Sequence, residues 1–255
     1  MNFFQAAVLG VVQGFSEFLP VSSSGHLVLV QNFFGITEDG LAFDVFLHFA
    51  TLLAVIIYFR SDLLKLSKKM IYAIFIASIP AGLVGIFLED YITAAFNSLT
   101  LVGVGLIITG IFNFITEHRL KSAKDPKTSI STTQALIIGL FQAFAVLPGV
   151  SRSGSTVFAG VSQNLERKLA FRFSFIMSLP VVFGANLIHV SRIVNGNSYE
   201  GNLFALMIGG ALAFITGLLS LKILEIVMVK AKMNYFGMYC TVIGLLVILF
   251  SILQF

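Results

Sequence analysis

Long apolar stretches separated by short polar segments run along the whole chain. A stretch of roughly 18–25 apolar residues is long enough to cross a bilayer as a helix. Pro80 lies inside one such stretch and predicts a kink there. Six full transmembrane helices are predicted, at residues 41–59, 70–88, 99–117, 169–190, 202–225 and 234–254. The pattern therefore predicts an all-α polytopic membrane protein.

Two further apolar stretches are interrupted by Pro, Ser and Gly. Residues 3–19 and 26–35 are separated by PVSSSG, and residues 130–147 and 151–163 are broken by PGVSRSG. The second piece of each pair is too short to cross a bilayer, so each pair is predicted to form a re-entrant helical hairpin. Broken helices of this kind carry binding sites inside membranes.

The two hairpins are copies of one another. Residues 5–25 align with residues 134–154 at an offset of 129 without a gap, and Leu41-Ala42-Phe43 recurs as Leu169-Ala170-Phe171. This repeat predicts one integral membrane domain over residues 1–255, with a first repeat at 1–117 and a second at 130–255. Nine of the 21 hairpin residues are identical: Gln5/Gln134, Ala6/Ala135, Gly10/Gly139, Gln13/Gln142, Phe15/Phe144, Val21/Val150, Ser22/Ser151, Ser24/Ser153 and Gly25/Gly154.

Each half then has one re-entrant hairpin and three full spans, an odd number, so the second half is predicted to be inverted relative to the first. Loop charges agree, because all basic residues between the spans except Arg192 fall on one predicted face. The positive-inside rule places that face in the cytoplasm. Both termini and the mouth of the first hairpin are expected outside. The basic residues of that face are Arg60, Lys65, Lys68, Lys69, Arg119, Lys121, Lys124, Lys127, Arg167, Lys168, Lys222, Lys230 and Lys232.

Composition supports this topology. Hydrophobic residues make up 57% of the chain and charged residues 11%, against about 25% charged in soluble domains. The mean hydropathy is +0.96. The net charge of +4 is explained by the loops that set orientation, so no nucleic-acid partner is expected. The single Cys240 excludes an intrachain disulfide.

Glu17 is an ionisable residue inside the first hairpin, where a charge is costly and marks a functional candidate. Gln13 precedes it by four residues and shares its helix face. The alternative is that the Glu17 carboxylate stays hydrated near the mouth of the hairpin and has no role in a functional site. The following Ser22-Ser23-Ser24 run can cap a new helix whose free N–H groups favour an anion. His26 is a candidate acid or base, although small-residue packing explains the same run.

Arg152 lies in the break of the second hairpin. An arginine deep in a membrane needs an anionic partner, and its planar fork suits phosphate or carboxylate. The hydroxyl residues around it are Ser151, Ser153 and Thr156. A purely structural pair of Arg152 with Glu17 is the alternative. A second set of residues, Asp44, His48 and Arg172, is expected to pack or to support the site, with direct chemistry as the alternative. The target of such a site is an anionic group, best a phosphate or diphosphate, on an amphipathic molecule.

These residues carry a resemblance to the undecaprenyl-diphosphate phosphatases, also called bacitracin-resistance proteins, over essentially the full length. The family's (E/Q)xxxE motif appears as Gln13-Gly14-Phe15-Ser16-Glu17 and runs on into FLPVSSSGH. Its PGxSRSxxT motif is complete from Pro148 to Thr156. Two departures are Gln13, where many members have Glu, and Ala50, where Gly is expected.

The resemblance implies six full spans and two re-entrant hairpins in inverted repeat. It implies hydrolysis of a C55 polyprenyl diphosphate to the monophosphate at the outer face of the cytoplasmic membrane, which recycles the carrier for cell-wall glycans. Bacitracin binds the diphosphate and so competes for substrate. A divalent cation such as Mg²⁺ or Ca²⁺ is implied as cofactor, with Glu17 as its ligand.

By the same resemblance, Glu17, His26 and Arg152 match the essential positions, and Ser22 and Ser23 match the serine pair that supplies a proposed nucleophile. Ser23 is the predicted nucleophile, with water as the alternative. Gln13, Ser22, Ser24, Ser151, Ser153 and Thr156 are the predicted substrate-binding residues. A flippase for polyprenyl phosphate that uses the same midplane site is the competing function. A homodimer is left open.

Overall fold

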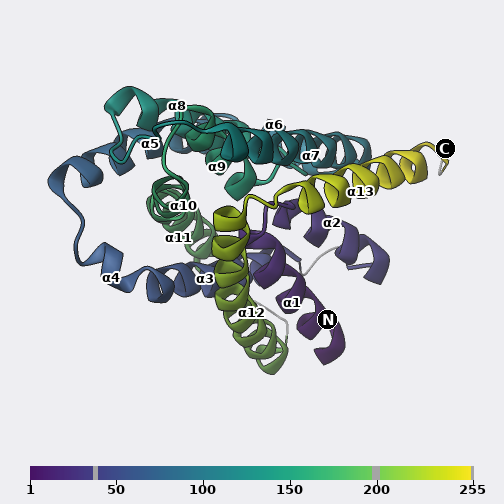
Figure 1. Cartoon of the computed structure of the whole chain (residues 1–255). Helices are drawn as coiled ribbons and strands as arrows, with labels where there is room; N and C mark the ends of the chain where they lie inside the picture. Colours follow the sequence, from purple (N-terminus) through teal and green to yellow (C-terminus); the bar gives the residue numbers. More distant parts are fainter. Residues whose placement is uncertain (37–39, 197–201, 254–255) are drawn as a thin grey trace.

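The computed structural model describes residues 1–36, 40–196 and 202–253, with backbone alone at 40–42, 189 and 192–196. The side chain of Arg192, the one basic loop residue predicted on the outer face, is not among those described. Every regular element in the described ranges is an α-helix, as predicted. The helices (Figure 1) are α1 Phe3–Phe18, α2 Ser23–Phe34, α3 Gly40–Tyr58, α4 Arg60–Leu63, α5 Lys68–Phe87, α6 Glu89–Phe96, α7 Leu99–Ser122, α8 Thr132–Phe144, α9 Arg152–Ser162, α10 Arg167–Ile176, α11 Ser178–Gly196, α12 Leu203–Lys230 and α13 Asn234–Leu253.

Each predicted hairpin forms a pair of packed helices, α1 on α2 and α8 on α9. That each pair enters and leaves the bilayer on one side stays a prediction. Their first helices begin with the same capping box. The Asn2 side chain accepts a hydrogen bond from the Gln5 N–H, and Gln5 Oε1 accepts one from the Asn2 N–H. Ser131 and Gln134 repeat this arrangement at α8. A capping box satisfies two of the helix's unpaired N–H groups, which explains why this glutamine occurs in both copies.

Five helical segments in the described residues are long and apolar enough to cross a membrane: Lys68–Phe87, Leu99–Ser122, Arg167–Ile188, Leu203–Lys230 and Asn234–Leu253. The sixth predicted span, 41–59, forms α3, whose described side chains make an apolar helix from Phe43 to Tyr58. The prediction for 169–190 missed an interruption between α10 and α11 at Met177. Pro180 lacks the N–H that would bond to the Ile176 carbonyl, which accounts for the interruption.

The helices of the two halves pack reciprocally. Helix α1 lies against α12 of the second half, and α8 lies against α5 of the first half. Gly10 and Gly139 are the repeated residues at these two contacts. A Cβ at Gly10 would lie 2.3 Å from the Gly209 carbonyl oxygen, and one at Gly139 would lie 2.4 Å from that of Ala77. Both glycines therefore permit close helix packing, as expected for two related halves.

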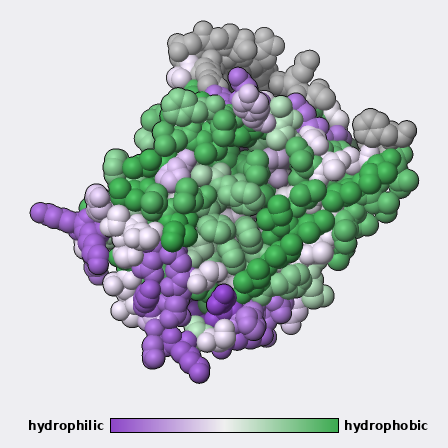
Figure 2. All heavy atoms as spheres, turned by 90° about the horizontal axis from the view of Figure 1, so that it is seen from above, coloured by the Kyte–Doolittle hydropathy of each residue, from purple (hydrophilic) through white to green (hydrophobic). Residues whose placement is uncertain are grey.

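The surface is dominated by apolar side chains. In Figure 2 a broad hydrophobic area covers most of the visible face, and hydrophilic side chains gather toward one edge. Large hydrophobic residues are more than half exposed on α5 and α13, among them Phe75 at 63% and Leu249 at 54%. Such faces are stable only against lipid, since a soluble protein rarely exposes large apolar patches. The chain is a multi-pass membrane protein.

Candidate functional site

Each hairpin break starts a helix with a serine cap. Ser22 Oγ accepts a hydrogen bond from the Gly25 N–H at 3.3 Å, and Ser151 Oγ accepts one from the Gly154 N–H at 3.1 Å. Ser22 has a φ of 73° and a ψ of 99°, which is rare for a residue with a side chain. Backbone strain of this kind concentrates at functional sites. The breaks thus bring two helix N-termini together, with Ser23 and Arg152 as their first residues.

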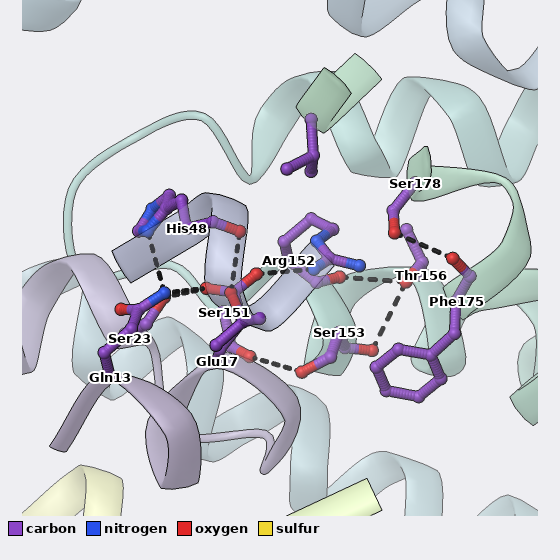
Figure 3. Close-up of polar contacts among 12 residues, drawn as sticks. Gln13, Glu17, Ser23, His48, Ser151, Arg152, Ser153, Thr156, Phe175 and Ser178 are labelled. Atoms are coloured by element: carbon purple, nitrogen blue, oxygen red, sulfur yellow. Dashed lines mark hydrogen bonds and ion pairs between the residues drawn. The ribbon is translucent and has the colours of Figure 1, made fainter. Parts of the chain in front are cut away.

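The Glu17 carboxylate lies between these two first residues (Figure 3). Its Oε1 accepts a hydrogen bond from Arg152 Nη2 at 2.6 Å. Its Oε2 accepts one from Ser23 Oγ at 2.6 Å. The side chains of Glu17 and Arg152 are 10% and 17% exposed. The structure therefore joins three of the four predicted catalytic residues in one contact network that is still accessible from outside the protein.

Gln13 extends the network to α3. Its Nε2 donates to Glu17 Oε2 at 3.2 Å and lies 2.7 Å from His48 Nδ1. Gln13 is fully buried, and among the described residues no donor reaches its Oε1. The prediction that His48 supports the site is consistent with this contact. Gln13 is thus placed to orient Glu17 and to offer one oxygen to a further ligand.

Arg152 uses only part of its guanidinium within the protein. Its Nη2 is bonded to Glu17, but no acceptor for its buried Nη1 is found in the part of the chain that the structure describes. The guanidinium carbon lies 5.9 Å from the centre of the Phe175 ring. Phe175 contacts a cluster of further aromatic rings, Phe18, Phe59 and Phe171. The site thus combines a guanidinium nitrogen that has no acceptor among the described residues with a cluster of aromatic side chains next to it.

Four of the predicted hydroxyl ligands are more deeply buried than Glu17 and Arg152. Ser22, Ser151, Ser153 and Thr156 are at most 2% exposed. Ser153 Oγ donates to the Leu19 carbonyl at 3.4 Å, and Thr156 Oγ1 lies 2.5 Å from Ser174 Oγ. Ser24 Oγ is 3.3 Å from Ser22 Oγ. Their direct contact with substrate stays a prediction. In the structure Ser22 and Ser151 cap the helix starts, and Thr156 joins α9 to α10.

Both ring nitrogens of His26 contact groups other than the Glu17 carboxylate. Its Nδ1 lies 2.7 Å from the Ser22 carbonyl oxygen, and its Nε2 lies 2.7 Å from Tyr239 Oη. A carbonyl only accepts, so Nδ1 carries the proton and Nε2 accepts from the tyrosine. The His26 and Tyr239 rings are stacked, 5.5 Å apart. His26 therefore holds the strained Ser22 peptide next to Ser23.

The two remaining support candidates bind elsewhere. Asp44 Oδ1 accepts from Gln31 Nε2 at 2.8 Å, which joins α3 to α2. Arg172 Nη2 pairs with Asp62 Oδ1 at 2.5 Å. Sequence reasoning also missed two polar residues of α7, Thr109 and Asn113, which bind the hairpin breaks. Their signal was a pair of polar residues four apart inside an apolar span.

The donors for a divalent cation are few. Within the described residues, no group of three or more His, Cys, Asp and Glu side chains is close enough to hold a metal ion. Magnesium, however, is often held by one or two carboxylates together with substrate phosphates. The Glu17 carboxylate and the unsatisfied Gln13 Oε1 match that smaller requirement.

These features define a class: a polytopic helical membrane protein whose two discontinuous hairpins join a carboxylate, a serine and an arginine in one site. The family described as "Bacitracin resistance protein BacA" matches residues 6–246. The chain belongs to this family.

Relatives named "Undecaprenyl-diphosphatase" match along nearly the whole length. The protein of Methanococcus vannielii is 40% identical over 95% of this chain and 98% of its own. That of Halothermothrix orenii is 37% identical over 98% and 99%. That of Desulforapulum autotrophicum is 38% identical over 98% of each chain. The resemblance recognised from the two motifs is confirmed.

Proposed function

We propose that this chain hydrolyses undecaprenyl diphosphate, or a similar polyprenyl diphosphate, to the lipid monophosphate and inorganic phosphate. One observation carries the proposal: the Glu17 carboxylate bridges Ser23 Oγ and Arg152, and Arg152 Nη1 is left unsatisfied. A diphosphate supplies the oxygens that this nitrogen needs. The names of the relatives support the same substrate class.

In the proposed reaction, Arg152 Nη1 and the N–H groups at the start of α2 and α9 bind the terminal phosphate. Ser23 Oγ attacks the terminal phosphorus in line and passes its proton to Glu17 Oε2, which lies 2.6 Å away. The bond from phosphorus to the bridging oxygen breaks, and the lipid monophosphate leaves. Water then attacks the phosphorus of the phosphoserine, the bond between phosphorus and Ser23 Oγ breaks, and inorganic phosphate leaves with the protons of the water. Ser23 Oγ regains its proton from Glu17. Positioning and electrostatics dominate phosphoryl transfer, which fits a site of few reactive groups.

The roles of the serine and the histidine follow from their contacts. Ser23 has its proton acceptor already in place, which favours serine over water as nucleophile. The alternative, attack by water with Glu17 as base, needs Ser23 only as a ligand. His26 acts by holding the Ser22 carbonyl rather than by moving the proton of Ser23. The serine hypothesis requires a phosphorylated protein that Ser23→Ala abolishes.

The divalent cation is also a proposal. Glu17 and Gln13 Oε1 would hold it, together with oxygens of the substrate. Such an ion neutralises charge on the diphosphate. Because this chain has glutamine at position 13, Glu17 supplies the one carboxylate found there among the described residues. We expect weak cation binding in the absence of substrate.

We further propose that the site opens to the outer face of the cytoplasmic membrane. The asymmetry of basic loop residues supports a cytoplasmic location for the opposite face and an external location for both termini. A site that opens to the outer face binds the diphosphate on the same side of the membrane as bacitracin, so the two compete for this lipid. Dimerisation stays a prediction.

The test is phosphate release from undecaprenyl diphosphate by the purified protein, beside Glu17→Gln and Glu225→Gln. Glu225 is a matched control because it accepts a hydrogen bond from Tyr58 at 2.5 Å, away from the hairpin breaks. We expect release by the parent and by Glu225→Gln, and a loss of at least about 100-fold in Glu17→Gln. A folded parent that binds the lipid and releases no phosphate would favour the flippase instead.

A further inference from the structure

Helix α7 contacts both hairpin breaks through two buried polar side chains, Thr109 and Asn113. Thr109 is fully buried and Asn113 is 1% exposed. Four residues apart, they lie on the same face of the helix, one turn from each other. Neither belongs to the motifs that identify the family from sequence.

Thr109 binds the second break at two points. Its Oγ1 accepts a hydrogen bond from the Ser151 N–H at 2.9 Å. Its single proton is shared between two carbonyl oxygens that each lie 3.0 Å away, that of Gly149 in the break and that of Gly105 in its own helix. The break interrupts helical hydrogen bonding, so these backbone groups need partners from outside the hairpin. The Thr109 hydroxyl is such a partner for two backbone groups of the break, in the residues just ahead of Arg152. It therefore fixes the two peptides of the break that precede Ser151, just ahead of Arg152.

Asn113 binds the first break. Its Nδ2 donates to the Pro20 carbonyl at 2.7 Å. The Pro20 peptide lies two residues before the strained Ser22 and three before Ser23. Cys240 of α13 lies 3.6 Å from the same carbonyl and contributes only a weak donor. Asn113 is therefore the strong donor that holds the chain just ahead of the serine.

One rigid helix thus contacts both break segments one turn apart, and the two segments carry Ser23 and Arg152. We propose that Thr109 and Asn113 are positioning residues that set the separation between the two breaks, and with it the alignment of Ser23, Glu17 and Arg152. This inference rests on the proposed function. Neither side chain touches the reacting groups, so their effect passes through the backbone of the breaks. Misplacement of reacting groups by about 1 Å can lower a rate by about 100-fold.

The same structure offers matched controls. Thr116 is 1% exposed on α7, and its hydroxyl donates only to the Phe112 carbonyl of its own helix, at 2.7 Å. Asn186 is 6% exposed, and its Nδ2 donates to the Val182 carbonyl of its own helix at 2.8 Å. Thr116→Val and Asn186→Leu therefore remove equally buried polar groups without releasing a break.

The experiment compares Thr109→Val and Asn113→Leu with these controls in detergent. Phosphate release gives kcat and KM, and hydrogen exchange with mass spectrometry reports the break segments. We expect kcat to fall between about 10-fold and about 100-fold in both test variants, with KM changed by less than about threefold. We expect faster exchange over residues 148–154 in Thr109→Val only. Thr109→Ser keeps the hydroxyl and should restore most of kcat. Melting temperatures should fall equally in test and control variants.

Several results would overturn the inference: a kcat for Thr109→Val within twofold of that for Thr116→Val, no rescue by serine, or unchanged exchange over the break. If Thr109→Val does not fold, Thr109→Cys takes its place, because a thiol is only a weak donor. If the parent and both controls release no phosphate, the proposed function fails. In that case the exchange data alone decide whether Thr109 of α7 holds the second break.

Discussion

Replacing Arg152 with lysine separates the two uses of the guanidinium. Nη2 binds Glu17 at 2.6 Å, whereas Nη1 is buried with no partner in the described part of the chain. Lysine keeps the positive charge next to Glu17 but has a single nitrogen to serve both carboxylate and phosphate. The substitution therefore removes one fixed donor to the substrate while it keeps the ion pair. Loss of one such donor costs about 100- to 1,000-fold in turnover, or about 3–4 kcal/mol.

The assay is phosphate release from farnesyl diphosphate by purified protein, with melting temperature as the check on folding. Arg172→Lys is the matched control, since Arg172 pairs with Asp62 at 2.5 Å and is not part of the Glu17 network. We expect Arg152→Lys to fold and to lose turnover by the factor above, and Arg172→Lys to stay within about threefold of the parent. Turnover of Arg152→Lys close to that of the parent would refute the role given to Nη1.

Four further predictions follow from the surroundings of single residues. Gly149 has a φ of 80°, and a Cβ there would lie 2.1 Å from a carbonyl oxygen of α7, so Gly149→Ala should lower the free energy of unfolding by about 2–4 kcal/mol. Gly184→Ala, with no atom within 4 Å, should be neutral or stabilising by up to about 1 kcal/mol in the same unfolding measurement. If His26 acts by donating from Nδ1 to the Ser22 carbonyl, His26→Asn should keep clearly more turnover than His26→Gln, and equal losses in a phosphate-release assay would contradict that role. Gln13→Glu should lower the Mg²⁺ concentration needed for half-maximal phosphate release, because a second carboxylate joins the site; an unchanged requirement would argue against a cation there.

The repeat was readable from sequence, and the structure explains why several of its residues are identical. Gln5 and Gln134 complete capping boxes, and Gly10 and Gly139 allow close helix contacts. The reactive groups lie instead where the halves differ: Glu17 aligns with a valine in the second half, and Ser23 aligns with Arg152. The shared residues thus build two similar breaks, and the differing residues make one asymmetric site.

The rest depended on contacts between distant segments, which periodicity does not encode. Glu17 and Arg152 are 135 residues apart, and the sequence allowed either a functional or a purely structural pair. The direction of His26 toward Tyr239, 213 residues away, had no local signal. Thr109 and Asn113 resembled ordinary polar residues of a span until their partners in the two breaks were known.

The most direct test of the account follows the terminal phosphate itself. Undecaprenyl diphosphate labelled with ³²P at that phosphate is incubated with the purified protein, and the products are separated by chromatography. We expect the label to appear as inorganic phosphate and the lipid as its monophosphate, and we expect Glu17→Gln to leave the diphosphate intact. Recovery of the intact labelled lipid after incubation with folded parent protein, or equal release by Glu17→Gln, would contradict the account.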